Sequence, residues 1–276
     1  MGLYENHNIT ITEVTPEYRE KYLGSKSAYI LTRSSAKIIK GEKLGYVTGV
    51  CYLRSFRKIG SINTCSHAKL ANCYKPCLEN SGKMSLPIAI LAREKRLNLL
   101  IENPQAFFSI LISDIEKIER KAKKMGMGTA YRLNGTSDLE WNRILINGKS
   151  IFELFPDLIW YDYTKNPKIA ETYRAIGLSC TLSWYPKLDT KGVCDHLDQG
   201  GNVAIAYHGR KLPDTQRIGD KLYRVIDGDI SDLRFLDDEG VVVGLRYKYA
   251  TGKDSKDINR LAKKSEFIKY IDTPIV

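Results

Sequence analysis

The chain of 276 residues is long enough for one large α/β domain or for two domains of ordinary size. Hydrophobic residues make up 43% of it and charged residues 27%, a balance that is typical of globular proteins and excludes a disordered chain. The formal net charge of +11 favours a polyanionic partner, a nucleic acid or a phosphorylated substrate. Scattered lysines that only solvate the surface explain the charge equally well.

No apolar run is long enough to span a bilayer, and the N-terminus lacks the basic-then-apolar pattern of a secretory signal. We therefore expect a cytoplasmic protein without a membrane partner. In that reducing compartment the six cysteines are metal ligands or core thiols rather than disulfides. Cys51 and Cys180 lie inside apolar runs and are assigned to the core. Cys194 stands alone, and a partly exposed thiol is the favoured interpretation over a distant fourth metal ligand.

The first elements predicted along the chain are short strands. Polar and β-branched residues alternate over positions 8–15, which predicts a strand, and positions 28–32 predict another. Positions 1–45 would form a small N-terminal β element. A third, more apolar strand covers 45–53, and two helices follow, the first over 86–100. The second begins with Asn103 as N-cap and Pro104 at the first helical position, and Gly126 and Gly128 stop it.

The rest of the chain alternates short apolar strands with helices. Strands are predicted over 129–133, 158–161, 178–182, 203–207 and 240–247, and helices over 150–155 and 166–176. This alternation is typical of parallel βαβ units. We therefore predict an α/β fold with a mostly parallel sheet, a partial (β/α)6 TIM-like barrel that spans residues 46–276.

Three thiols fall within thirteen residues, at Cys65, Cys73 and Cys77, with the spacing C-x7-C-x3-C. Three clustered thiolates are enough to hold an iron–sulfur cluster or, with one more ligand, a zinc ion. His67 lies between them and could complete a zinc site, although its position two residues from a ligand would strain the geometry. We call residues 63–77 the cysteine loop. It follows a predicted strand, so its metal should face the carboxyl ends of the strands.

Polar residues end three further predicted strands, and ligands of α/β sheets bind at such ends. A helix cap explains any one of these residues taken alone, but three consecutive polar strand ends favour a shared pocket. The predicted cofactor-binding residues are Asn134, Thr136, Ser137, Asp138, Asp162, Tyr163, Lys165 and Ser183.

An aspartate-rich stretch covers residues 224–238. It lacks the glycine and glutamate positions of an EF-hand, and hairpin turns at Asp227-Gly228 and at positions 237–240 are the favoured interpretation. Asp229, Asp232 and Arg234 remain candidate pocket residues. No nucleophile elbow, P-loop or zinc-protease motif is present, which argues against those enzyme classes.

Four segments together resemble a family of uncharacterised bacteriophage and prophage proteins. They are the cysteine loop, residues 132–138 (RLNGTSD), residues 155–165 with YDYTK, and residues 225–237 with DGD and DLRFLD. The resemblance spans roughly positions 49–248 and implies a phage origin, and hence the cytoplasm of the infected cell, rather than an activity.

A looser similarity is to radical S-adenosylmethionine enzymes, which carry a three-cysteine loop after the first strand of a partial barrel. That resemblance implies a [4Fe–4S] cluster on Cys65, Cys73 and Cys77 and S-adenosylmethionine as a further cofactor. The net charge of +11 would then serve a nucleic acid or nucleotide as substrate. The spacing departs from the C-x3-C-x2-C usual in those enzymes, and no glycine-rich methionine-binding motif is evident. The alternative is a non-enzymatic nucleic-acid-binding protein in which zinc or a cluster only staples the loop. A third possibility is that no metal binds and the three thiols are core residues.

Overall fold

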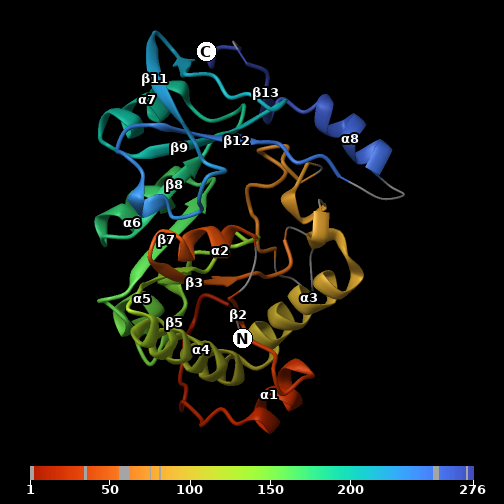
Figure 1. The fold of residues 1–276 in the computed structure, drawn as a ribbon, viewed down its shortest axis with the longest axis vertical. Coiled ribbons are helices and arrows are strands. Elements are labelled where there is room, and N and C mark those ends of the chain that lie inside the picture. The colour runs from red at the N-terminus through yellow and green to blue at the C-terminus, as the bar shows by residue number, and fades with distance from the viewer. Residues whose placement is uncertain are drawn as a thin grey trace. The chain divides into compact units, whose positions relative to one another are not determined.

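The computed structural model describes residues 3–33, 36–55, 63–74, 76–80, 82–250, 255–271 and 273–276. The chain divides into two compact units (Figure 1). The first unit comprises Met1–Cys65 and Pro87–Tyr161, and the second comprises Ser66–Leu86 and Asp162–Val276. The chain therefore enters the second unit within the cysteine loop, returns to the first at Pro87, and crosses again inside strand β7.

The first unit has a small sheet with helices before and between its strands. Strand β2 runs antiparallel to β3, β3 parallel to β4, and β4 parallel to the start of β7. A second, minor sheet joins β1, β5 and β6. The elements are β1 (Asn6–His7), α1 (Pro16–Leu23), β2 (Leu31–Thr32), α2 (Ala36–Glu42), β3 (Tyr46–Cys51), α3 (Pro87–Glu102), α4 (Pro104–Met125), β4 (Gly128–Arg132), η3 (Trp141–Arg143), β5 (Leu145–Ile146), β6 (Lys149–Ser150), α5 (Ile151–Leu154) and β7 (Ile159–Thr164).

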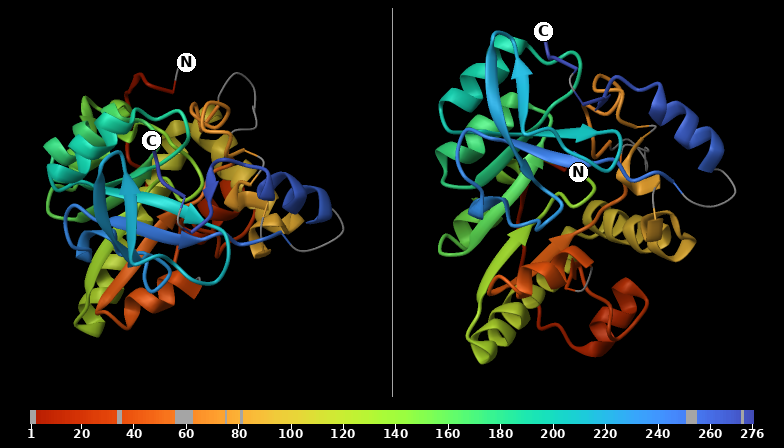
Figure 2. Two further views of the ribbon diagram at one scale, coloured as in Figure 1. Left: turned by 90° about the horizontal axis from the view of Figure 1, so that it is seen from above. Right: turned by 45° about the horizontal axis from the view of Figure 1, so that its top comes forward.

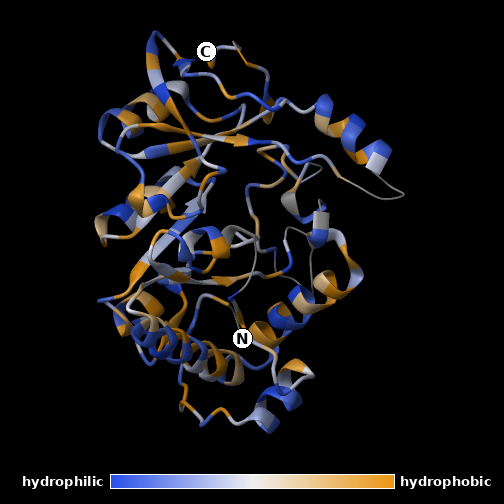
Figure 3. Ribbon diagram, viewed as in Figure 1, coloured by the Kyte–Doolittle hydropathy of each residue, from blue (hydrophilic) through white to orange (hydrophobic). Residues whose placement is uncertain are grey.

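Helix α4 is the core element of the first unit. The sequence signals that begin and end it lie at the two ends of the helix itself. Asn103 caps it by accepting a hydrogen bond from the Ala106 amide at 2.9 Å, Pro104 begins it, and Gly126 ends it with a φ of 63°. Phe107, Leu111, Ile115 and Ile118 are buried, and the helix contacts β3 and β4. In Figure 3 blue hydrophilic turns alternate with orange hydrophobic ones along α4, as expected for a helix with one face on a sheet.

The second unit is built on parallel strands in the order β8, β9, β12 and β11, with β10 antiparallel at the edge and β13 also paired with β9 (Figure 2). Its elements are η1 (Leu78–Asn80), η2 (Gly82–Ser85), α6 (Pro167–Ala175), β8 (Ser179–Ser183), α7 (Thr190–Asp198), β9 (Asn202–Tyr207), β10 (Thr215–Ile218), β11 (Lys221–Asp227), η4 (Arg234–Leu236), β12 (Val242–Arg246), α8 (Ser255–Lys263) and β13 (Ile268–Lys269). Val203 is the register partner of both Leu182 and Val242, so the parallel strands end at one edge.

The predicted α/β class with mostly parallel strands is confirmed. Among the described residues the pairings close no barrel. The segment expected as an N-terminal β element contains the helices α1 and α2 as well as β1 and β2. The strand predicted over 8–15 is wrong: the amide and carbonyl of Ile9 bond to the side chain of Asn147, and the amide of Thr12 bonds to Ser109 Oγ. Side chains thus satisfy backbone groups that a strand would pair with a neighbour.

Candidate functional site at the carboxyl ends of the strands

The start of the cysteine loop is held by the loop that follows β4. The backbone amide of Asp138 donates to the Thr64 carbonyl at 2.7 Å, and the hydroxyl of Thr136 donates to the Leu53 carbonyl at 2.5 Å. Cys65 Sγ lies 3.7 Å from the Thr136 carbonyl oxygen. The first predicted metal ligand therefore lies beside the residues that follow β4, two of them predicted as cofactor-binding.

Asn134 organises that loop from within. Its side chain is 2% exposed, and its Oδ1 accepts hydrogen bonds from Ser137 Oγ, the Leu139 amide and Trp141 Nε1 at 2.8, 2.9 and 3.0 Å. Its Nδ2 donates to the Leu139 carbonyl at 3.0 Å. Both polar atoms of the amide therefore shape the loop, and contact of Asn134 or Ser137 with a cofactor stays a prediction.

Three described residues of the cysteine loop, His67, Asn72 and Cys77, have neighbours elsewhere in the second unit. The His67 ring is 6.4 Å from the Tyr185 ring, just beyond β8, and Ser265 Oγ donates to the Asn72 carbonyl at 3.3 Å. Burial raises the pKa of Tyr247 to about 12, with smaller contributions from Tyr249 and Cys77. The Cys77 thiol therefore lies within electrostatic range of the first residue after β12.

The remaining predicted cofactor-binding residues belong to the second unit, at the ends of β7 and β8. Asp162 is 2% exposed, and its Oδ1 accepts a hydrogen bond from the Tyr163 amide at 2.9 Å. Lys165 Nζ lies 5.5 Å from the Phe267 ring, and Ser183 is the half-buried last residue of β8. Neither a bound ligand nor a catalytic role is established for them, so their assignment stays a prediction.

An aromatic cluster that the sequence reasoning missed lies at the same edge of the second unit. It consists of His208, Tyr247, Tyr249 and Tyr270, which follow β9, β12 and β13. His208 is stacked on Tyr270 with ring centroids 4.3 Å apart, and its Nδ1 lies 2.9 Å from the Tyr249 hydroxyl. Tyr247 meets Tyr249 edge to face at 5.0 Å. Tyr270 is 57% exposed, so the aromatic cluster reaches solvent.

The ring of His208 is neutral at physiological pH. Burial, and next the positive charge of Lys263, lower its pKa below the ordinary value of 6.5. A neutral imidazole can stack against tyrosine rings without paying to desolvate a charge. The sequence signal that could have revealed the cluster is the placement of His208 and of Tyr247-Lys248-Tyr249 directly after apolar strands.

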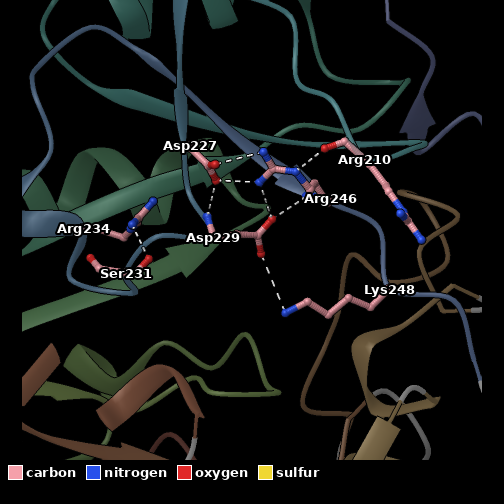
Figure 4. A network of polar contacts seen from close by, with 7 residues as sticks. All are labelled: Arg210, Asp227, Asp229, Ser231, Arg234, Arg246 and Lys248. Carbon is pink, nitrogen blue, oxygen red and sulfur yellow. Dashed lines mark hydrogen bonds and ion pairs between the residues drawn. The ribbon is translucent and has the colours of Figure 1, made fainter. Parts of the chain in front are cut away.

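The aspartate-rich stretch forms an ion-pair network at the ends of β11 and β12 (Figure 4). Arg246 Nη1 and Nη2 contact the two carboxylate oxygens of Asp227 at 2.7 and 2.9 Å. The backbone amide of Arg246 donates to Asp229 Oδ2 at 2.9 Å, and Lys248 Nζ lies 3.7 Å from Asp229 Oδ1. Asp229 therefore helps to tie two strand ends together.

The predicted hairpin turn at Asp227-Gly228 is wrong, because β11 and β12 are parallel, with Val225 opposite Val242. The backbone amide of Gly228 instead donates to the Gly244 carbonyl. Arg234 is buried beneath this edge, where its Nη2 donates to the Ser231 carbonyl at 2.6 Å and its Nη1 lies 3.2 Å from Asp237 Oδ2. Burial raises the pKa of Asp237 to about 6 although Arg234 opposes the shift.

Within the described part of the chain, no group of three or more His, Cys, Asp or Glu side chains is placed to hold a metal ion. Cys65 belongs to the first unit, and Cys73 and Cys77 belong to the second. All three thiols are half-buried, whereas Cys51 and Cys180 are buried as expected for core thiols. The metal assignment of the three stays a prediction.

No helix of the described residues combines the length and hydropathy needed to cross a bilayer.

These features define a mixed α/β protein whose parallel strands carry polar and aromatic residues at their carboxyl ends. The family model of Gene product 88 (GP88) matches residues 29–268. The chain belongs to this family, which is of phage type, and the expected phage origin is thereby confirmed. No curated protein and no solved structure matches the chain.

Proposed function

We propose that the protein is a phage-encoded iron–sulfur protein that acts on a nucleic acid or nucleotide at the carboxyl ends of its strands. The observation that carries this proposal is the course of the cysteine loop. Cys65 contacts the loop after β4, the His67 ring lies near Tyr185 beyond β8, and Cys77 lies within electrostatic range of Tyr247 after β12. A loop that only connected two elements would not need contacts near strand ends, and strand ends are where α/β proteins bind ligands.

The thiols have the character that ligation requires. Cys65 Sγ and Cys73 Sγ lie 3.7 and 3.8 Å from backbone carbonyl oxygens, contacts typical of weak S–H donors that metal binding can replace. Cys65, Cys73 and Cys77 would hold a [4Fe–4S] cluster, and its fourth iron would remain open to a small molecule such as S-adenosylmethionine. Asn134 would keep the loop after β4 in shape, and Thr136 and Asp138 would fix the position of Cys65.

The finer form of the proposal is an enzyme of the radical S-adenosylmethionine type on a partial (β/α)6 barrel. In its support, β3 and β4 of the first unit and β8 and β9 of the second are parallel neighbours in chain order, as such a barrel requires. Thr136, Asp162, Tyr163, Lys165 and Ser183 would contact the cofactor or substrate from the strand ends.

A polyanionic substrate is supported by the aromatic cluster and by the cations around it. Tyr249 and Tyr270 are exposed, and Lys248 lies between the two tyrosines that follow β12. Lys263 is close enough to His208 to lower its pKa. Exposed aromatic rings among cations are the means by which proteins bind single-stranded nucleic acid without reading its sequence. The net charge of +11 would support this interaction in the cytoplasm of the infected cell.

The second candidate is a non-enzymatic nucleic-acid-binding protein in which zinc staples the cysteine loop. The contact of His67 with Tyr185 favours it, because this histidine lies among the cysteines and next to a strand end. A closed site with four protein ligands would be structural.

The test is the iron, zinc and sulfide content of protein purified without oxygen, with spectra recorded before and after S-adenosylmethionine is added. Cys73→Ala should remove the metal, and Cys180→Ser, which changes a buried core thiol, should leave it unchanged. About four irons per chain and a spectral shift on addition of the cofactor support the enzyme. One zinc and no iron support the structural staple, and full metal content in Cys73→Ala would refute both.

A further inference from the structure

A pocket of about 640 Å³ lies in the first unit, apart in sequence from the cysteine loop. Its lining includes Tyr29, Thr32, Arg33, Arg96 and Lys121. Three of these five side chains are cations, and they come from the segment around β2, from α3 and from α4. A pocket of this size accommodates a small organic molecule.

The guanidinium groups of the pocket are held by neutral partners. Arg96 Nε donates to the Tyr29 carbonyl at 3.0 Å, and its Nη1 donates to the Tyr52 carbonyl at 3.4 Å. The guanidinium carbon of Arg33 lies 3.7 Å from the centre of the Tyr29 ring. Among the described residues neither arginine forms an ion pair with a carboxylate, so their positive charge is not neutralised within this part of the chain.

The buried carboxylate next to the pocket, that of Asp114, already has partners within the first unit. Asp114 pairs with Arg19 at 2.6 Å, and its Oδ2 accepts the backbone amides of Ile30 and Leu31 at 2.7 and 3.0 Å. Among the described residues, Lys121 is the one lining cation with an acidic partner, Glu42 at 3.2 Å, and that pair is partly exposed. The pocket therefore carries an excess of positive charge.

Two cations in or beside the pocket have lowered pKa values, chiefly because they are desolvated. Burial lowers the pKa of Arg96, and burial followed by the positive charge of Arg19 lowers the pKa of Lys117, whose Nζ lies 5.9 Å from the Tyr29 ring. A bound anion would compensate both the burial and the repulsion.

We infer that this pocket binds a phosphate group, carried by a small phosphate ester or present as free phosphate. Arginine forks match the oxygens of a phosphate in pairs, and two arginines with a lysine supply the charge that a dianion requires. The Tyr29 ring has Arg19 at 4.7 Å and Arg33 at 3.7 Å, so its contacts are with cations and recognition centres on the anion rather than on a stacked base. This inference does not depend on the proposed metal or on nucleic-acid binding.

The test is isothermal titration of the full chain with inorganic phosphate and, separately, with a nucleoside monophosphate. Arg33→Gln should weaken binding about tenfold or more, because one charged partner of the phosphate is lost. Arg217→Gln, at an exposed position of β10, makes the same change of charge in the second unit and should leave the affinity unchanged. Thermal unfolding of each variant checks that it is folded, and Lys121→Gln provides a second test on another wall of the pocket.

Tighter binding of the monophosphate than of inorganic phosphate would identify a phosphate ester as the ligand, and equal binding would identify free phosphate. Absence of binding by the unmodified protein would overturn the inference. So would equal affinity in the unmodified protein, the Arg33 variant and the Lys121 variant.

Discussion

Removal of the Asn134 side chain should destabilise the first unit more than its small size suggests. In Asn134→Ala, the Leu139 amide and the fully buried Trp141 indole lose Asn134 Oδ1 as acceptor, whereas the Leu139 carbonyl keeps its hydrogen bond from the Trp141 amide at 3.1 Å. A buried polar group left without a partner costs about 1–3 kcal/mol. With two such groups, we expect the free energy of unfolding to fall by about 2–5 kcal/mol, a large part of the stability of an ordinary domain.

The matched control is Ser137→Ala. This change removes one hydroxyl that donates to Asn134 Oδ1 at 2.8 Å and leaves the other two donors in place. The loss of one hydrogen bond together with its donor should cost only about 0.5–1.5 kcal/mol.

Urea unfolding followed by tryptophan fluorescence and by far-ultraviolet circular dichroism measures both changes, with the m-value checked for constancy. A loss in Asn134→Ala no greater than that in Ser137→Ala would refute the reasoning. It would mean that water or a relaxed loop satisfies the Leu139 amide and the Trp141 indole.

Two further predictions concern the second unit. Because the pKa of Asp237 is about 6 in the folded protein against 3.8 in the unfolded chain, the folded state binds the proton more tightly, and the free energy of unfolding should fall as pH rises between these values. Asp237→Asn should flatten this dependence in urea midpoints measured across the interval, and parallel curves for the two proteins would contradict it. Tyr270→Ala should weaken binding of a single-stranded oligonucleotide about tenfold in fluorescence anisotropy, since a stacked base contributes about 1–3 kcal/mol. Tyr4→Ala, an exposed tyrosine of the first unit, is its control, and an equal loss in both would exclude a specific role for the aromatic cluster.

Local signals predicted the helices α3, α4, α5 and α6 and most of the parallel strands correctly, but not the helices α1, α2, α7 and α8. Helix α4 begins and ends where its capping residues stand, because Asn103 and Gly126 act within one turn of the helix they limit. Strands β7, β8, β9 and β12 were found because apolar runs of this length are stable only inside a sheet. The β10–β11 hairpin was missed although Gly219 and Asp220 form its two-residue turn, a signal present in the sequence.

Two of the failures concern partners that lie elsewhere along the chain. Residues 8–15 have the alternation of a strand, but Ile9 pairs with Asn147, 138 residues away, and no neighbouring pattern reveals that. Asp227-Gly228 has the composition of a turn, yet the parallel pairing of β11 with β12 uses it as a strand end. A turn motif indicates which backbone dihedral angles cost little energy. The pairing of strands in the sheet determines whether the chain adopts them.

The sequence by itself determined the class of fold, the buried thiols Cys51 and Cys180, and the strand ends at which polar residues gather, since each depends on hydrophobicity and periodicity over a short stretch. Only the tertiary structure decided which of those residues meet. It made Asn134 the organiser of its loop and joined Thr136 to Cys65. It also stacked His208 on Tyr270 across 62 residues of chain and brought Arg33 and Arg96 to one pocket. Contacts between distant residues depend on the order and register of strands, which burial of the whole sheet selects and no local pattern encodes.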